Sequence, residues 1–174
     1  MHLSFHINSS DLQAFIDHWS ARYKYPWQHK YDDHIGLPLT TDSRLALFEW
    51  KNGSIISARK LKSIDQNYPQ RFEGDRVGRY LNHQQPGGAI WNIFYLHCLS
   101  PSDWPIYDQH THRAMKFMTT GQIVEIGSTK KQKYACYLEE FMPFLASMGD
   151  FDGRTLDKAL FAFGQFLKLA KHYT

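Results

Sequence analysis

Pro101-Ser-Asp-Trp-Pro-Ile-Tyr-Asp108-Gln-His-Thr-His-Arg-Ala-Met115 is the stretch that places one carboxylate at the start of a helix. Pro101 and Pro105 fix their own φ and disfavour the helical region for the residue before each, so we expect residues 100–106 to be extended or turned. Asp108 then falls where a helix begins, since an aspartate there accepts a backbone N–H from two or three residues on and its charge is favoured by the helix dipole. This helix is predicted to run to Gly121, a common residue type just beyond a helix end.

Apolar residues at helical spacing recur on both sides of this stretch. The pattern predicts further helices at residues 11–23, 42–51, 58–68, 75–82, 90–99, 134–145 and 156–170. Residues 90–99 are apolar nearly all round, which predicts a central helix buried on most sides. Residues 24–40 are expected to form a long irregular connection, and residues 122–126 an extended loop. The chain is therefore predicted to be a single all-α domain of six to eight helices.

Several of these helices also carry recognisable end signals in the sequence. Ser10-Asp11-Leu12-Gln13 has the form of a capping box, Thr40 or Thr41 can cap the helix at 42–51, and Asn52-Gly53 can end it. Ser57 is a candidate cap for the next helix, and Asp152 or Thr155 for the last one.

Composition limits the classes of protein that this chain can represent. A chain of 174 residues is long enough to bury a sizeable core. Its formal charge of +3 permits contact with phosphates but is lower than that of a dedicated nucleic-acid binder. Cys98 and Cys136 form no C-x-x-C pair, which argues against a disulfide framework or zinc knuckle and favours a cytoplasmic protein. The first seven residues lack a charged leader followed by an apolar run, and no stretch is apolar for long enough to span a membrane.

Pro105-Ile-Tyr-Asp108-Gln-His110-Thr-His-Arg-Ala114 resembles the Pro-Val-Asp-Val-His segment of the oxoguanine DNA glycosylases, members of the helix-hairpin-helix DNA glycosylase superfamily. Pro86-Gly-Gly-Ala89, followed by the apolar run 90–99, is similar to the Pro-Gly hairpin and helix that precede the aspartate of that family. The likeness covers residues 84–120. It implies a helix-hairpin-helix glycosylase-like fold, double-stranded DNA as partner, and Asp108 as catalytic carboxylate, with no cofactor.

The same resemblance bears on the type of chemistry. Family members that form a Schiff base with the sugar need a lysine just after the hairpin, and this chain has none at that position. The resemblance therefore implies a monofunctional hydrolase that cleaves the N-glycosidic bond, unless another lysine, such as Lys51, supplies lyase chemistry. A carboxylate held at a helix start can stabilise an oxocarbenium-like sugar or orient the attacking water once the nucleotide is flipped out of the duplex.

Further residues are candidate DNA contacts. Backbone N–H groups at Gly87 and Gly88 can hold a phosphate at the start of a helix, although Pro-Gly-Gly by itself is usually only a turn. The other candidate contacts are His110, His112, Lys60 and Lys62 for DNA binding, and Trp91, Trp104 and Tyr107 for stacking on a base. Each has a structural alternative: a packed histidine, a solvated lysine or a core ring.

A metal site is not expected at the histidines. His110 and His112 would point about 200° apart on a helix, so they would diverge rather than converge on an ion, even with His97 nearby in sequence.

Three hypotheses remain open on the sequence. The first is base-lesion recognition or excision with Asp108 as the functional carboxylate. The second is a catalytically inactive relative that still binds DNA, and the third is an all-α protein-interaction module in which Asp108 only caps its helix. The sequence leaves the choice of lesion and the oligomeric state open.

Overall fold

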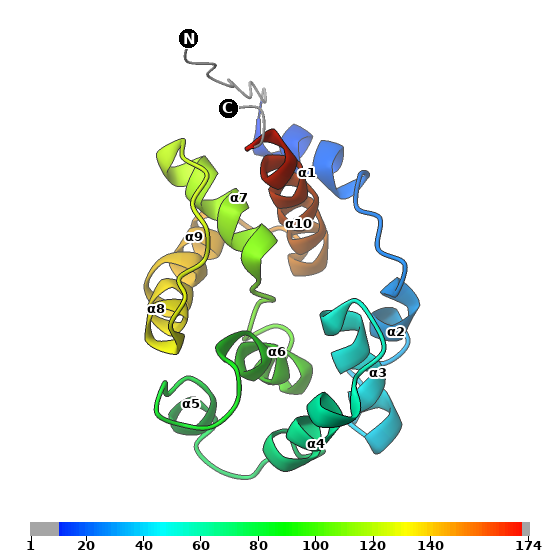
Figure 1. Ribbon diagram of the computed structural model, residues 1–174. Helices are drawn as coiled ribbons and strands as arrows, with labels where there is room; N and C mark the ends of the chain where they lie inside the picture. The colour runs from blue at the N-terminus through cyan, green and yellow to red at the C-terminus, as the bar shows by residue number, and fades with distance from the viewer. Residues whose placement is uncertain (1–10, 172–174) are drawn as a thin grey trace. The chain divides into compact units, whose positions relative to one another are not determined.

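A computed structural model describes residues 11–171 of the chain, which are coloured in Figure 1. The expectations about Ser10 and the first seven residues lie outside these described residues. The described part is all-helical, with no strand and with 62% of the chain in helices, which confirms the predicted fold class. It divides into two compact units, one formed by residues up to Lys24 with Tyr107–Ser128 and the chain from Ala135 on, the other by Tyr25–Ile106 with Thr129–Tyr134.

The first unit is organised around its longest helix. Its elements are α1 (Leu12–Ser20), α7 (Gln109–Thr120), a π-helix (Cys136–Phe141), α9 (Met142–Ser147) and α10 (Gly153–Ala170). Helix α10 packs against both α1 and α7 (Figure 1). The buried ring of Phe163 in α10 lies 5.2 Å from the ring of Phe15 in α1 and 5.8 Å from that of Phe117 in α7, measured between centroids. Aromatic contacts therefore form the core between these three helices.

Helices α7 and α10 approach each other closely at one glycine. A Cβ atom added to Gly164 in α10 would lie 2.0 Å from the carbonyl oxygen of His110 in the first turn of α7. Only a residue without a side chain fits at this crossing, so Gly164 sets the distance between the two helices where α7 begins.

The second unit contains the hairpin region. Its elements are α2 (Gln28–Asp32), α3 (Thr41–Asn52), α4 (Ala58–Asn67), α5 (Arg76–Tyr80), α6 (Ala89–Leu99) and most of α8 (Lys130–Ala135). Eight of the eleven residues of α6 are buried, and the ring of Phe94 lies against Phe48 and Trp50 of α3. Within this unit α6 is the buried helix that its apolar sequence predicted.

The local end signals were confirmed at most helices. Asp108 caps α7, Thr40 caps α3, Ser57 caps α4 and Asp152 caps α10, each through its side chain. Gly53 and Gly121 end α3 and α7 with φ of 71° and 70°, the left-handed conformation that glycine adopts without strain. Residues 122–126 belong to no helix or strand, which confirms the predicted loop.

Two predictions about the helices were wrong. The described residues hold nine helices rather than six to eight, counting α8, the π-helix and α9 as one continuous helix. The additional one is α2, inside the segment 24–40 that was expected to be irregular. Tyr31 in α2 is buried, and its hydroxyl bonds to Nε2 of His97, 2.7 Å away. Tertiary burial of Tyr31 therefore stabilises a helix too short to form by itself.

The helix predicted at 134–145 is not a regular α-helix. Residues Cys136–Phe141 form a π-helix between α8 and α9, and Pro143 is the second residue of α9. Because proline lacks the N–H that would bond to the carbonyl of Glu139, we attribute the wider turn to Pro143.

None of the helices in the described residues has the length and apolar character needed to cross a membrane.

Candidate functional site

Asp108 is fixed at the start of α7 by a reciprocal cap. Its Oδ1 accepts hydrogen bonds from the backbone N–H of His110 at 2.7 Å and of Thr111 at 3.1 Å. The Thr111 hydroxyl in turn accepts from the Asp108 backbone N–H at 3.0 Å. The residue is half-buried, and backbone N–H groups orient its carboxylate. The arrangement suits a carboxylate that must keep both charge and position.

A buried arginine, Arg113, connects the first turn of α7 to the neighbouring segments. Arg113 is 2% exposed, and its guanidinium donates to both carboxylate oxygens of Glu125, with the shortest distance 2.9 Å. It also donates to Nδ1 of His110 at 3.1 Å and to the carbonyl of Gly164 at 3.3 Å. The Arg113 hydrogen bonds hold the pKa of the Glu125 carboxyl below its usual value. Arg113 thus ties α7, α10 and the 122–126 loop together beside Asp108.

His110 takes part in the packing of α7 against α10. Its Nδ1 accepts from Arg113, and its ring stands edge-on to Phe161 at 4.8 Å. Burial lowers the pKa of His110, so the ring favours the neutral form. As a candidate phosphate contact, it is half-buried and already engaged.

Tyr107 and His112 lie in the core, which corrects their predicted roles as DNA contacts. Tyr107 is 0% exposed and His112 is 3% exposed. The Tyr107 hydroxyl bonds to Nδ1 of His112 at 2.9 Å, and the Cys136 sulfur lies 3.5 Å from the same nitrogen. Burial raises the pKa of the Tyr107 phenol and the Cys136 thiol and lowers that of His112, so all three groups are held neutral. In this position Tyr107 cannot stack on a base and His112 cannot reach a phosphate.

The Pro-Gly hairpin of the second unit rests on a buried asparagine. Asn92 is 0% exposed, accepts from the Tyr68 hydroxyl at 2.8 Å and donates to the Tyr134 hydroxyl at 2.8 Å and the Pro86 carbonyl at 3.3 Å. Gly87 has a φ of 95°, and a Cβ there would lie 2.2 Å from Oδ1 of Asn92. The hairpin backbone therefore needs glycine at 87, and Asn92 fixes it through its side chain.

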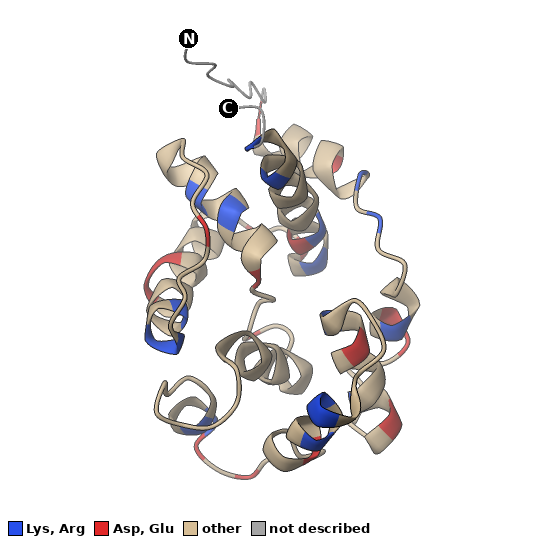
Figure 2. Cartoon of the chain, in the orientation of Figure 1, with Lys and Arg blue, Asp and Glu red and all other residues tan. Residues whose placement is uncertain are grey.

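The remaining candidate contacts of the second unit lie on its surface or partly buried. Lys60 and Lys62 are exposed on α4, and the Lys60 ammonium lies 5.6 Å from the ring centre of the half-buried Trp91. Trp104 is also half-buried, and its carbonyl accepts from Nδ1 of His97 at 2.8 Å. Figure 2 shows lysines and arginines on many helices with acidic residues between them, and several basic residues close together in the sequence of α4 and of α8. Lys60 and Lys62 on α4 thus remain accessible candidates for phosphate contact.

Lys51, the alternative source of an amine, lies at the end of α3. It is half-buried, and its ammonium lies 5.6 Å from the ring centre of Phe94. The structure places it in the second unit, against aromatic rings.

Within residues 11–171, no three side chains of His, Cys, Asp or Glu come together in a way that could hold a metal ion. His97 is engaged at both ring nitrogens: because a carbonyl can only accept, Nδ1 donates to Trp104 and Nε2 accepts from the Tyr31 hydroxyl.

Two supporting residues, Arg113 and Asn92, were missed from the sequence. Arg113 looks like one more polar residue on a surface helix, and nothing local shows that it is buried. Asn92 could have been found, because it is the polar exception in the apolar run 90–99, and such a residue must be hydrogen-bonded when buried.

No protein-family model, curated protein or solved structure matches the chain.

Proposed function

We propose that this chain recognises or excises a modified base in double-stranded DNA, with Asp108 as the carboxylate that acts on the N-glycosidic bond. The observation that carries the proposal is the cap itself: two backbone N–H groups hold Oδ1 of a half-buried aspartate at the start of a twelve-residue helix. The resemblance of residues 84–120 to the helix-hairpin-helix DNA glycosylases supports the same proposal. We extend the proposal to the fold of that family and to a cytoplasmic location.

The chemistry follows from the position of the charge. As the bond between base and sugar breaks, positive charge develops at C1′, and an anion fixed in advance stabilises it at no cost of reorganisation. Arg113 contributes indirectly, since it holds the first turn of α7 in place through His110. The exposed lysines of α4 and the backbone of the Gly87–Gly88 hairpin would contact phosphates.

The test compares two helix-capping aspartates. Asp108→Asn keeps a good capping residue and removes the charge, and Asp152→Asn makes the same change at the start of α10, where Asp152 accepts from Thr155. Purified proteins are incubated with duplexes that carry oxidised, deaminated or alkylated bases, and abasic sites are detected as alkali-labile breaks. We expect Asp108→Asn to lower base release by about a hundredfold or more, as for removal of a group that stabilises the transition state. We expect Asp152→Asn to match the unaltered protein.

Absence of base release from every duplex, or equal activity of the two variants, would refute the catalytic proposal. The second hypothesis, DNA binding without chemistry, is favoured by the well-supported hairpin and by the burial of Tyr107, which removes one of the rings that could stack on a flipped base. It would be recognised by affinity for duplexes that falls steeply with salt and is lost when Lys60 and Lys62 are replaced. No affinity at low salt would leave the protein-interaction module.

A further inference from the structure

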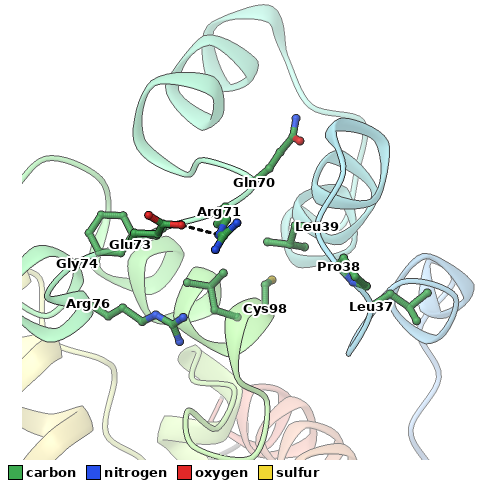
Figure 3. Close-up of a pocket in the computed structure, with 11 residues that line it drawn as sticks. Leu37, Pro38, Leu39, Gln70, Arg71, Glu73, Gly74, Arg76 and Cys98 are labelled. Carbon is green, nitrogen blue, oxygen red and sulfur yellow. Dashed lines mark ion pairs between the residues drawn. The ribbon is translucent and has the colours of Figure 1, made fainter.

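A cavity of about 660 Å³ opens in the second unit. One wall is residues 37–39, before α3. A second is residues 70–74, between α4 and α5, together with Arg76 at the start of α5, and the third is the end of α6 at Cys98 and Leu99. Figure 3 shows these segments around a common space. The volume falls within the range of roughly 300–1,000 Å³ that is typical of sites for small molecules.

The lining of the cavity combines apolar side chains with one uncommitted cation. Arg76 lines it and makes no hydrogen bond or ion pair with any residue that the structure describes. The other lining arginine, Arg71, is paired with Glu73 at 2.8 Å, the interaction drawn as a dashed line in Figure 3. Burial raises the pKa of the Cys98 thiol, so this side of the cavity carries no negative charge. Because the charges of Glu73 and Arg71 balance each other, the lining has one unpaired positive charge, that of Arg76.

The apolar part of the lining is partly exposed to water. Leu37 is 57% exposed at the edge of the cavity, and Leu39, Phe72 and Leu99 are half-buried around it. A ligand with an apolar body would remove this surface from water, which is the favourable term in binding.

The walls are held in place without a ligand. The Tyr68 carbonyl, at the start of the 70–76 loop, accepts from Arg44 at 2.6 Å, and Gln70 donates to the Thr41 hydroxyl at 2.7 Å. The ring of Phe72 is fixed edge-on to Tyr80 at 5.1 Å. Such a preformed site loses little entropy when it binds.

We infer that this cavity binds a small organic anion, an apolar body that carries one carboxylate or phosphate group, with Arg76 pairing the anion and Leu37, Leu39 and Phe72 covering the body. A guanidinium is suited to either group because it donates two parallel hydrogen bonds. The inference is independent of the proposed function, since it uses none of the residues assigned to DNA.

The test uses anilinonaphthalene sulfonate, a fluorescent probe with an apolar body and one anionic group. We expect saturable binding with one site per chain, weakened about tenfold in Arg76→Gln, the factor expected for loss of one charge-assisted hydrogen bond near the surface. Arg59→Gln is the matched control, because Arg59 is exposed on α4, lies outside the cavity and suffers the same change of charge. Leu37→Ser should weaken the probe several-fold, whereas Leu169→Ser, at an equally exposed leucine of α10, should not.

Competition identifies the anion. Displacement of the probe by phenylbutyrate more readily than by phenyl phosphate supports a carboxylate ligand, and the reverse order supports a phosphate ligand. Failure of both to displace it, or equal weakening in Arg76→Gln and Arg59→Gln, would overturn the inference. Thermal unfolding checks that each variant is folded. We expect Arg76→Gln to keep the Tm of the unaltered protein, because the Arg76 side chain makes no hydrogen bond or ion pair with the described residues.

Discussion

Replacement of Gly164 by alanine tests the closest contact between α7 and α10. The new Cβ would lie 2.0 Å from the carbonyl oxygen of His110, 2.5 Å from its carbonyl carbon and 2.8 Å from its Cα. Ordinary contact begins near 3.4 Å, so the helices would have to separate by about 1.4 Å at this point. All three atoms belong to the backbone, so no side-chain rotation can relieve the overlap.

The expected cost can be set against the gain in helix propensity. Overpacking of a core costs about 1–3 kcal/mol, and the rigid neighbour puts Gly164→Ala at the upper end of that range. Alanine returns about 1 kcal/mol relative to glycine inside a helix, which leaves a net loss of about 2 kcal/mol. For a chain of this length, that loss lowers Tm by about 4–8 °C. The assay is urea unfolding followed by circular dichroism, together with thermal unfolding.

Gly153→Ala is the control on the same helix. No atom lies within 4 Å of a Cβ at Gly153, so we expect unchanged or slightly higher stability. If Gly164→Ala were as stable as Gly153→Ala, the close packing of α10 on the first turn of α7 would be refuted, and with it the account of how Asp108 is positioned.

Two further predictions concern buried polar groups. Asn92→Leu should lower the free energy of unfolding by about 3 kcal/mol, because it leaves two buried tyrosine hydroxyls without their amide partner and leaves the Pro86 carbonyl with Arg79 alone. A loss below about 1 kcal/mol in urea unfolding would show that the asparagine does not hold the hairpin. Burial lowers the pKa of His112, so the unfolded chain binds the imidazole proton more readily than the folded chain does. The stability that the neutral His112 ring contributes is therefore complete above the unfolded pKa of about 6.5. It is lost as the pH falls through the lower folded pKa. The decline in unfolding free energy from about pH 7 to about pH 5 should therefore be shallower in His112→Gln than in the unaltered protein, and identical slopes would contradict this reasoning.

The helix ends could be predicted from the sequence because capping is local. Asp108 and Gly121 act through backbone groups within one turn of themselves, so residue type and spacing determine their roles. The central α6 was also predictable, since a run that is apolar all round can only be buried.

The parts that could not be predicted depend on contacts distant in sequence. Tyr107 and Asp108 are neighbours, yet one is in the core and the other half-exposed, and a list of aromatic and basic residues near the aspartate cannot distinguish them. Arg113 is buried because Glu125 and Gly164 converge on it from two other segments. The short helix α2 likewise needs His97, sixty-six residues away, to bond with Tyr31.

The charge of Asp108 and its placement can be separated by combining two variants. Asp108→Asn removes the charge and leaves the helix crossing intact, whereas Gly164→Ala retains the charged aspartate but shifts the first turn of α7 to which its carboxylate is bonded. If base release depends on a carboxylate at that precise position, each single variant lowers it and the double variant is no worse than Asp108→Asn alone. If Gly164→Ala acts only by unfolding a fraction of the molecules, its effect instead multiplies with that of Asp108→Asn and disappears at lower temperature, where the folded fraction is restored. Non-additivity would therefore tie the packing of α10 to the position of the reacting group.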